Sequence, residues 1–412
     1  MNIRIESERI TRELETLAAF SEAPAPAVTR IVFSEQDRRA RTWLKQLYAE
    51  AGLRVREDAV GNTFARLAGA DENLAAVATG SHTDAIPHSG RFDGTVGVLG
   101  GLEAIRALQR SGYQPRRSVE LIMFTAEEPT RFGIGCLGSR LMASTLDAGA
   151  GDRLRDSEGR TLNEVRHGAG FAGELESVAL QPGCYAAFVE LHIEQGPLLE
   201  RRNLPVGVVT AIAAPASLWI TVEGQGGHAG AVLMRDRHDA FSAAAEIALT
   251  LESAARSTGA VDSVATTGLC EVFPGAINSI PSRVRLAVDI RDIDEARRDG
   301  MLAELERACA EIAAKREVGI SSEWVNRDAP AACDPKIVSA LRDACRTSAL
   351  ELDLMVSRAY HDSLFMSRVC PSGMIFVPCR DGISHRPEEY ASPEWIAQGA
   401  LVLAEALANL AG

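Results

Sequence analysis

The sequence lacks closely spaced cysteines: its eight cysteines are scattered, and no two of them form a Cys-x-x-Cys motif. Neither a disulfide framework nor a thiolate metal site is therefore indicated, and a reducing cytoplasm fits best. No uninterrupted apolar stretch is long enough to span a bilayer. The first ten residues carry charges where a signal peptide needs an apolar core. We therefore expect a cytoplasmic protein with no membrane segment.

Positive charge is also scarce, because 43 Lys and Arg residues stand against 56 Asp and Glu residues, for a formal net charge of -13. No basic run is interleaved with aromatic residues, so we expect no nucleic-acid partner. The 412 residues exceed what one compact core usually holds, which predicts two domains. We find no internal repeat and no low-complexity linker.

A polar loop lies between two segments that are expected to be buried. The apolar run at 74–79 is typical of a buried strand, and the pattern at 95–108 is typical of a helix packed against a sheet. His82 and Asp84 follow the strand, and Asp93 precedes the helix. Ligands of open α/β sheets bind at this carboxyl edge. The loop therefore predicts metal ligation, with an ordinary polar loop as the alternative.

Polar side chains follow three further predicted strands. The strand at 119–124 ends in Glu127 and Glu128, and His385 lies in the loop beyond an apolar strand that begins at Gly373. The strand that begins at Ala186 runs into three polar residues, namely His192, Glu194 and Gln195. A solvated glutamate pair or a structurally satisfied histidine is the alternative at each place. Strand ends of this kind in series favour a functional site.

The pattern changes from about Pro215 to a strand–helix–strand–strand–helix–strand order. The expected strands lie near 217–223, 264–272, 284–290 and 318–324, and the expected helices near 236–255 and 294–314. This is the split, ferredoxin-like order. We therefore predict an α/β mixed-sheet domain formed by 1–212 and 331–412, with a ferredoxin-like α+β domain inserted at 213–330. Sheet edges of the inserted domain need protection, which predicts that it forms a homodimer.

The strand-end residues define a chemistry. Imidazole and carboxylate groups without thiolate suit Zn, Mn, Co or Ni. Five candidate ligands make the inventory of a two-metal site, namely His82, Asp93, Glu128, His192 and His385. Because adjacent residues of an extended chain point to opposite sides, Glu128 can bind metal while Glu127 serves as general acid/base. Asp84 would orient the ring of His82. Spacing alone does not show which ligands share an ion.

Five motifs carry a family resemblance: Gly80-Ser-His-x-Asp84, Arg91-Phe-Asp-Gly94, Glu127-Glu-Pro129, Leu191-His-Ile-Glu-Gln-Gly-Pro197 and Gly227-His-Ala-Gly230. Over nearly the whole chain the sequence resembles the dinuclear-metal amidohydrolases of the peptidase M20 superfamily. The branch is the one that contains allantoate amidohydrolase, N-carbamoyl-L-amino-acid hydrolase and β-ureidopropionase. The resemblance implies a metallohydrolase domain with an inserted dimerisation or lid domain, and two divalent ions per subunit. It favours Mn²⁺ and also allows Zn²⁺, Co²⁺ or Ni²⁺.

The same resemblance implies a role for each residue. His82 and His192 would bind one metal, Glu128 and His385 the other, and Asp93 would bridge them. Glu127 would be the general acid/base, with Asp84 beside it. The residues implied to contact the substrate are Gln195, His228, Asn278, Arg291, Tyr360 and His361, with His228 reaching into the partner's site. A structural ion pair of Arg291 with Asp289 or Asp292 is the alternative to carboxylate binding.

One departure from the family bears on the substrate. Much of the branch has Gly-Ala-Gly-His-Asp where this chain has Ser357-Arg-Ala-Tyr-His-Asp-Ser363. Tyr360 therefore replaces a glycine, which implies a smaller pocket. The implied reaction is cleavage of the terminal ureido C–N bond of a small ureido acid, with ureidoglycolate favoured, releasing ammonia and CO2 in purine nitrogen recycling. N-carbamoyl amino acids and allantoate are the alternative substrates, and a metal-free binding or regulatory relative is the alternative of another class.

Overall fold

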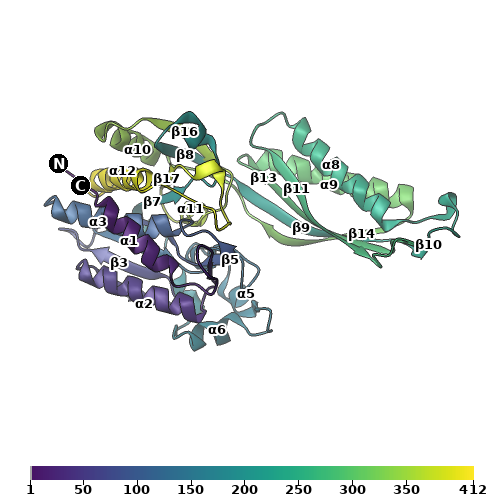
Figure 1. The fold of residues 1–412 in the computed structure, drawn as a ribbon, viewed down its shortest axis with the longest axis horizontal. Coiled ribbons are helices and arrows are strands. Elements are labelled where there is room, and N and C mark those ends of the chain that lie inside the picture. Colours follow the sequence, from purple (N-terminus) through teal and green to yellow (C-terminus); the bar gives the residue numbers. More distant parts are fainter. Residues whose placement is uncertain (1) are drawn as a thin grey trace. The chain divides into compact units, whose positions relative to one another are not determined.

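The structure, a computed structural model, describes residues 2–412. The chain forms two compact units. Unit 1 comprises the residues up to Thr210 together with Cys333–Met355 and His361–Gly412, and unit 2 comprises Ala211–Ala332 and Val356–Tyr360. Unit 1 contains a mixed sheet and unit 2 an antiparallel one (Figure 1). This confirms the predicted fold class, an α/β mixed-sheet domain with a separate ferredoxin-like α+β domain.

The sheet of unit 1 runs in the order β8-β17-β7-β4-β6-β3-β2. Its central strands β17, β7, β4 and β6 are parallel to one another, whereas β8 and β3 pair antiparallel to them. The central strands are buried along nearly their whole length, as is typical of parallel strands covered on both faces. The strands of unit 1 are β1 (Val28–Arg30), β2 (Arg54–Glu57), β3 (Thr63–Leu67), β4 (Ala76–His82), β5 (Ala85–Ser89), β6 (Val119–Phe124), β7 (Tyr185–Ile193), β8 (Val206–Ile212), β16 (Leu352–Ser357) and β17 (Ser372–Val377).

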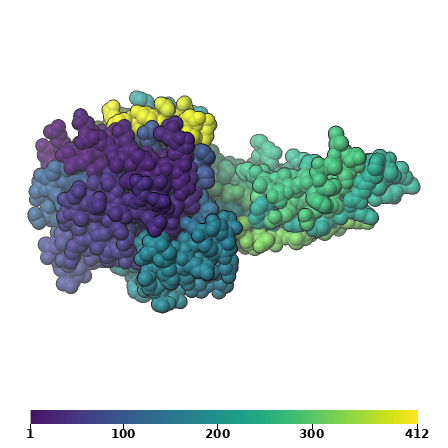
Figure 2. Space-filling model, turned by 60° about the horizontal axis from the view of Figure 1, so that its bottom comes forward, coloured from purple at the N-terminus to yellow at the C-terminus, as the bar shows by residue number. Residues whose placement is uncertain are grey.

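Helices cover the sheet of unit 1, and the sheet separates two hydrophobic cores, to which alternate residues of its strands contribute. The larger core contains the buried faces of α1 (Ser7–Ala18), α2 (Glu35–Glu50), α3 (Thr95–Arg110), α10 (Pro335–Thr347) and α12 (Pro393–Ala411). Ser7 donates a hydrogen bond to the carbonyl of Pro393, so the start of α1 contacts the start of α12, and the purple and yellow surfaces of Figure 2 adjoin. The smaller core, on Phe64, Phe124 and Phe188, is covered by shorter helices, among them α4 (Leu137–Met142), α5 (Ala148–Arg153) and α6 (Leu162–Gly168).

The parallel strands place the candidate residues at one edge. His82 is the last residue of β4, Glu127 and Glu128 follow β6, and His192 is the penultimate residue of β7. Because these strands run parallel and pair in the order β7-β4-β6, their carboxyl ends lie next to one another. His385 follows β17, the strand parallel to β7 on its other side. The topology therefore gathers residues that are up to several hundred positions apart in the sequence.

Unit 2 has the predicted ferredoxin-like order. Its four-stranded antiparallel sheet runs β11-β13-β9-β14, and the buried faces of its two long helices and of the sheet form one core. The elements in chain order are β9 (Ala214–Glu223), β10 (Gly227–His228), α8 (Ala240–Ser257), β11 (Val264–Phe273), β12 (Ser279–Ile280), β13 (Arg283–Asp292), α9 (Glu295–Arg316), β14 (Gly319–Arg327) and β15 (Ala331–Ala332). Each predicted strand and helix of this domain is present within a few residues of its predicted bounds.

Several elements were not predicted. Among them are β1, β5, β8, β10, β12, β15, β16, the short helices α4 to α6, α7 (Leu198–Arg202) and α11 (Asp362–Met366), and the 3₁₀ turns Leu175–Val178, Met234–Asp236 and Arg380–Gly382. Most are too short to show a period in the sequence. Across residues 2–412, no helix has the length and apolar character needed to cross a membrane.

Candidate active site

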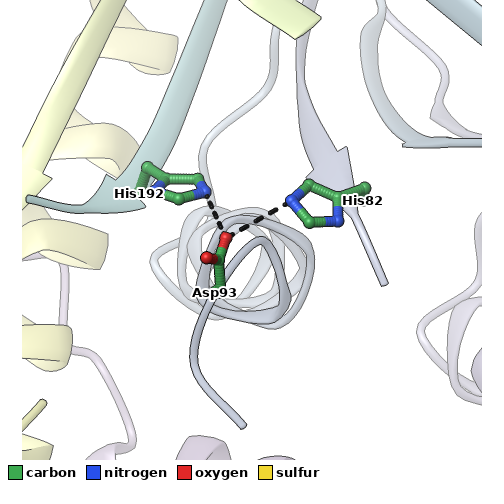
Figure 3. Close-up of side chains that lie close together, drawn as sticks. All are labelled: His82, Asp93 and His192. Atoms are coloured by element: carbon green, nitrogen blue, oxygen red, sulfur yellow. Dashed lines mark ion pairs between the residues drawn. The ribbon is translucent and has the colours of Figure 1, made fainter. Parts of the chain in front are cut away.

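Asp93 lies at the centre of a cluster of imidazole and carboxylate groups (Figure 3). Its Oδ1 is 3.2 Å from Nε2 of His192 and 3.5 Å from Nε2 of His82. Its Oδ2 is 3.1 Å from Nε2 of His385, which is in turn 3.5 Å from Oε1 of Glu128. Two groups that could hold a metal ion, His82–Asp93–His192 and Asp93–Glu128–His385, therefore share Asp93. The structure brings together all five residues that the sequence singled out.

Both buried histidines present the nitrogen that a metal ligand needs. Nδ1 of His192 is 2.8 Å from the carbonyl oxygen of Ile193, and Nδ1 of His82 is 3.0 Å from the carbonyl oxygen of Asp84. A carbonyl only accepts, so each Nδ1 carries the hydrogen, which assigns the lone pair of the neutral ring to Nε2. Both Nε2 atoms face Asp93. A Cβ at Gly94 would lie 2.4 Å from Nε2 of His82, so glycine is needed for this close approach.

Asp84 acts differently from the prediction. Its carboxylate was expected to orient the ring of His82, yet Oδ1 is 3.6 Å from Nδ1 of that ring, and the backbone carbonyl makes the hydrogen bond instead. The two carboxylate oxygens accept hydrogen bonds from the backbone N–H groups of Glu127, at 3.2 Å, and Glu128, at 3.0 Å. The carboxylate of Asp84 thus fixes the backbone at both glutamates, because it accepts from two consecutive N–H groups. Asp84 therefore positions both glutamates through their backbone.

The two glutamates are buried and electrostatically crowded. Burial raises the pKa of Glu127 well above its ordinary value, and the charge of Glu128 adds to this effect. Burial and the charge of Asp93 raise the pKa of Glu128 to about 7. Oε2 of Glu127 is 3.7 Å from Nε2 of His82, and the Cys136 thiol donates to its Oε1 over 3.6 Å. Such crowding of negative charge is relieved by a cation.

The pKa values of His82 and His385 are raised as well, but by neighbouring carboxylates rather than by burial. The hydrogen bond to Asp93 raises the pKa of His385 to about 9. Burial lowers the pKa of His82, but the carboxylates of Glu127, Asp84 and Asp93 outweigh it and leave that pKa well above its ordinary value. These histidines and glutamates therefore hold their protons more tightly than usual in the metal-free protein, and bound divalent cations would replace those protons. The donor set of three imidazoles and two carboxylates fits Mn²⁺, Zn²⁺ or a similar ion.

The metal-free protein is expected to lose stability as the pH rises, and Mn²⁺ is expected to restore it most at high pH. The pKa of Glu128 lies at about 7, above its ordinary value of 4.5, and that of His385 at about 9, above 6.5. A raised pKa means that the folded state binds the proton more tightly, so this stabilisation is complete below the ordinary pKa and is lost as the pH rises through the folded one. Metal replaces these protons. The increase in melting temperature on adding Mn²⁺ should therefore become larger as the pH is raised from about 5 to about 9. A gain that is the same at every pH would contradict this.

Gln195 contacts the cluster directly. Its Nε2 donates to Oδ2 of Asp93 over 2.7 Å. Its Oε1 is buried and has no hydrogen-bond partner among residues 2–412. Glu194, the polar neighbour that sequence analysis also noted, instead accepts hydrogen bonds from the N–H groups of Leu198 and Leu199 at the start of α7. Gln195 thus offers a free acceptor next to the cluster, whereas Glu194 has a structural role.

His361 is fully buried beside the cluster. Its ring centroid is 4.5 Å from that of His192, and Glu190 completes a third group of possible ligands with these two residues. The carboxylate of Glu190 is already engaged, because it accepts from the hydroxyl of Ser81 and from the N–H and hydroxyl of Ser363. Glu190 therefore stabilises the framework. Sequence reasoning missed it because it lies inside a buried strand, where no polar pattern marks it.

Four predicted substrate residues belong to unit 2. His228 in β10 pairs with β12, and the carbonyl of Asn278 accepts from the N–H of Ala229, so His228 and Asn278 lie together. Arg291 donates from Nε to Oδ1 of Asp289 over 2.7 Å, which is the structural ion pair that the sequence left open. The hydroxyl of Tyr360 is 2.5 Å from Oδ2 of Asp328. Its role toward a substrate stays a prediction.

These unit 2 residues fall into two groups at opposite ends of the sheet. Gly224, which precedes β10, donates to the carbonyl of Ser282, so His228 and Asn278 lie near the start of β13. Arg291 lies near the end of that strand, eight positions after Arg283, a separation of about 27 Å at ~3.4 Å per residue. Figure 1 shows β10 at the tip of the unit. A single small substrate cannot touch both groups of one chain.

A largely buried cluster of imidazoles and carboxylates, centred on one shared carboxylate at the carboxyl edge of a mixed sheet, is typical of a metal-dependent hydrolase. The sequence model of peptidase family M20/M25/M40 matches residues 78–409, and the chain belongs to this family. The resemblance inferred from the motifs is therefore confirmed.

Individual proteins resemble the chain over nearly its whole length. The chain is 52% identical to the ureidoglycolate hydrolase of Oryza sativa subsp. japonica, over 98% of this chain and 85% of that protein. It is 39% identical to the N-carbamoyl-L-amino acid amidohydrolase of Geobacillus stearothermophilus, over 99% of both chains. The crystal structure of AtUAH in complex with glyoxylate matches with a TM-score of 0.90 at 50% identity, over 99% of this chain and 98% of that one.

Proposed function

We propose that the protein hydrolyses the terminal ureido C–N bond of ureidoglycolate. The observation that carries this is the identity of 50 and 52% to two plant ureidoglycolate hydrolases over 98 to 99% of this chain. The N-carbamoyl-L-amino-acid amidohydrolases among the relatives are 32 to 39% identical. Cleavage of that bond releases ammonia and a carbamate. Loss of CO2 from the carbamate leaves hydroxyglycine, which expels a second ammonia to give glyoxylate.

Two divalent cations are proposed to bind at the cluster. His82, His192 and Asp93 would hold one, and Asp93, Glu128 and His385 the other, because each set converges within ligand distance. Mn²⁺ is favoured, with Zn²⁺, Co²⁺ or Ni²⁺ as alternatives. Ions of this kind make water a nucleophile near neutral pH and polarise a carbonyl.

Glu127 is proposed to move the proton. Its carboxylate is buried beside the cluster, is not needed in either ligand set and has a raised pKa. A carboxylate of this kind can accept a proton from the attacking water and deliver it to the leaving nitrogen. Asp84 holds its backbone and the Cys136 thiol donates to Oε1, so two contacts orient it.

Several of the residues predicted to contact the substrate are proposed to recognise it, each considered within its own unit. The free Oε1 of Gln195 can accept a hydrogen bond from a ureido N–H. Arg291 is half-buried, and its guanidinium donates to the carboxylate of Asp289 and, from Nη1, to the carbonyl of Arg358. The remaining N–H groups could bind the substrate carboxylate. His361 would line the site beside His192. Tyr360, held by Asp328, would limit pocket size.

A panel of substrates tests the proposal. The Mn²⁺-loaded protein should release ammonia and glyoxylate from ureidoglycolate with a kcat/KM at least ~10²-fold above that for allantoate or N-carbamoyl amino acids, since a site that hydrogen-bonds a substrate group discriminates strongly. The matched variant Tyr360→Gly should narrow this ratio. A wild-type preference for a carbamoyl amino acid or for allantoate would reject ureidoglycolate as the substrate. Absence of hydrolysis and of bound metal would instead favour a binding or regulatory relative.

A homodimer through unit 2 is proposed to complete the site. His228 and Asn278 lie at the opposite end of β13 from Arg291, so they can serve a substrate held by Arg291 only if they come from a second copy. The edge strand β11 is largely exposed. With α8 it lines an open groove of about 850 Å³ that includes Leu249 and Val261, which are 67% and 81% exposed. An exposed apolar edge of this kind is suited to pairing with another copy.

Mixing two inactive variants should restore activity. In a His228→Ala and Glu127→Gln heterodimer, one site would combine an intact Glu127 with an intact His228 of the other chain. Random exchange gives half heterodimers with one competent site each, so recovery should approach about a quarter of wild-type activity. Sedimentation velocity confirms the dimer, and labelled subunits confirm exchange. If exchange occurs without recovery, His228 serves its own chain's site. The predicted cytoplasmic location stays a prediction.

A further inference from the structure

Glu389 is a buried carboxylate that connects two parts of the cluster. It follows His385 by four positions, is 3% exposed and faces the loop that carries Asp93. Oε1 accepts hydrogen bonds from the N–H of Phe92 at 2.8 Å and from the N–H of Asp93 at 3.1 Å. Oε2 accepts from the hydroxyl of Ser384 at 2.8 Å. The side chain of Glu389 thus accepts hydrogen bonds both from the backbone at Asp93 and from Ser384, the residue before His385.

A glycine on the loop that carries Asp93 allows Glu389 to approach the backbone closely. A Cβ at Gly90 would lie 2.3 Å from the side chain of Glu389, so only glycine allows the approach. Helix α3 begins at Thr95, two positions after Asp93, and its N-cap residue, Gly94, has no side chain that could cap it. The carboxylate of Glu389 instead holds the two residues that lead into this N-cap, because it accepts from the N–H groups of Phe92 and Asp93. This fixes the start of α3 and with it the backbone of Asp93.

Ser384 extends the connection to the side chain of Asp93. Its hydroxyl is 3.0 Å from Oδ2 of Asp93 and 2.8 Å from Oε2 of Glu389. A hydroxyl has one hydrogen to donate, so it can serve only one of these carboxylates at a time. Glu389 therefore holds Asp93 through its backbone, and Ser384 links the same pair through the side chains.

We propose that Glu389 is a positioning residue that fixes Asp93 relative to His385, and so sets the geometry with which Asp93 bridges the two metal positions. This inference rests on the proposed two-metal function. It assigns Glu389 no contact with the substrate. Its effect should fall mainly on the position that Asp93 shares with Glu128 and His385, because Ser384 and Glu389 belong to the same loop as His385.

Binding of Mn²⁺ to purified variants tests the inference. In Glu389→Ala the N–H groups of Phe92 and Asp93 lose their acceptor. The second Mn²⁺, the ion assigned to Asp93, Glu128 and His385, should then bind ~10- to 100-fold more weakly, the usual loss when the partner of a metal ligand is removed. In Glu389→Gln the amide oxygen can still accept from both N–H groups, so affinity should stay within ~3-fold of wild type. Glu388→Ala is the matched control. The side chain of Glu388 is 56% exposed, so its removal should leave Mn²⁺ binding unchanged.

Three readouts separate the outcomes: calorimetric titration with Mn²⁺, the electron paramagnetic resonance signal of a coupled Mn²⁺ pair, and the melting temperature of the metal-free protein. Loss of the coupled signal in Glu389→Ala, with one tight Mn²⁺ retained and rescue in Glu389→Gln, supports the inference. Two tight ions with wild-type coupling in Glu389→Ala would overturn it. Equal weakening of both ions would also overturn it, since that indicates general destabilisation.

A second variant keeps the test valid if Glu389→Ala does not fold. Ser384→Ala breaks only the side-chain link and should weaken the second Mn²⁺ by several-fold, whereas unchanged binding and coupling would overturn the inference. Wild-type protein that binds one Mn²⁺ or none would instead reject the proposed two-metal function, which is a distinct result.

Discussion

Replacing Asp93 with alanine is expected to remove both metal ions together. The two oxygens of this carboxylate face different ligand sets, since Oδ1 lies near His82 and His192 and Oδ2 near His385. Loss of both ions removes several kcal/mol of transition-state stabilisation, so kcat/KM should fall by at least ~10³-fold at about 1.4 kcal/mol per tenfold. Elemental analysis after dialysis measures the metal content, and circular dichroism checks the fold.

Two variants sharpen this result. Asp93→Asn keeps one carbonyl oxygen but loses the charge and should retain less metal than wild type. Glu128→Gln affects one ligand set only and should keep the ion held by His82 and His192. An Asp93→Ala protein with two equivalents of metal and normal turnover would exclude Asp93 as the shared ligand.

Glu127→Gln is expected to keep its metal ions and lose ~10²- to 10⁴-fold in kcat, the usual scale for loss of a general acid/base. The amide preserves the shape of the side chain and the contact with Cys136, but it cannot accept a proton. KM for ureidoglycolate should change little. Elemental analysis and steady-state kinetics on the same preparation give both quantities.

The adjacent glutamate is the matched comparison. Glu128→Gln should lose activity together with the one ion assigned to Glu128 and His385, whereas Glu127→Gln should lose activity alone. If Glu127→Gln also loses metal, the roles of the two glutamates are misassigned. A wild-type kcat in Glu127→Gln would place the proton transfer on another group.

The five central residues could be predicted because each follows, or closely precedes, an element with a clear pattern. Buried parallel strands appear as apolar runs, so the polar residues after them stand out, as at His82 and Glu128. The parallel arrangement then places these residues at one edge. Local sequence is sufficient in this case, because the strand determines where the side chain lies.

Contacts between distant segments could not be predicted in this way. Glu389 is 296 positions from Asp93, and nothing in its own loop shows that it faces Phe92 and Asp93. The carboxylate of Asp84 likewise contacts N–H groups 43 and 44 positions away rather than the nearby His82 ring. Such pairings depend on how loops from different strands pack, which has no period in the sequence.

The ferredoxin-like order of unit 2 could be read from alternating strands and long helices, but the final extent of the unit could not. Residues 356–360, including Tyr360, return to unit 2 after a segment of unit 1. The sequence left open whether Arg291 binds a carboxylate of the substrate or forms a structural ion pair with Asp289 or Asp292. In the structure Arg291 pairs with Asp289, which shares its face of the strand, and Asp292 pairs with Arg297.

Anomalous diffraction from crystals of the Mn²⁺-loaded protein tests the central claim most directly. Data collected at the manganese edge should show two peaks about 3.5–4 Å apart. One peak should lie against His82 and His192 and the other against Glu128 and His385, with Asp93 between them. A single peak, or a pair of peaks that does not share Asp93, would contradict the account.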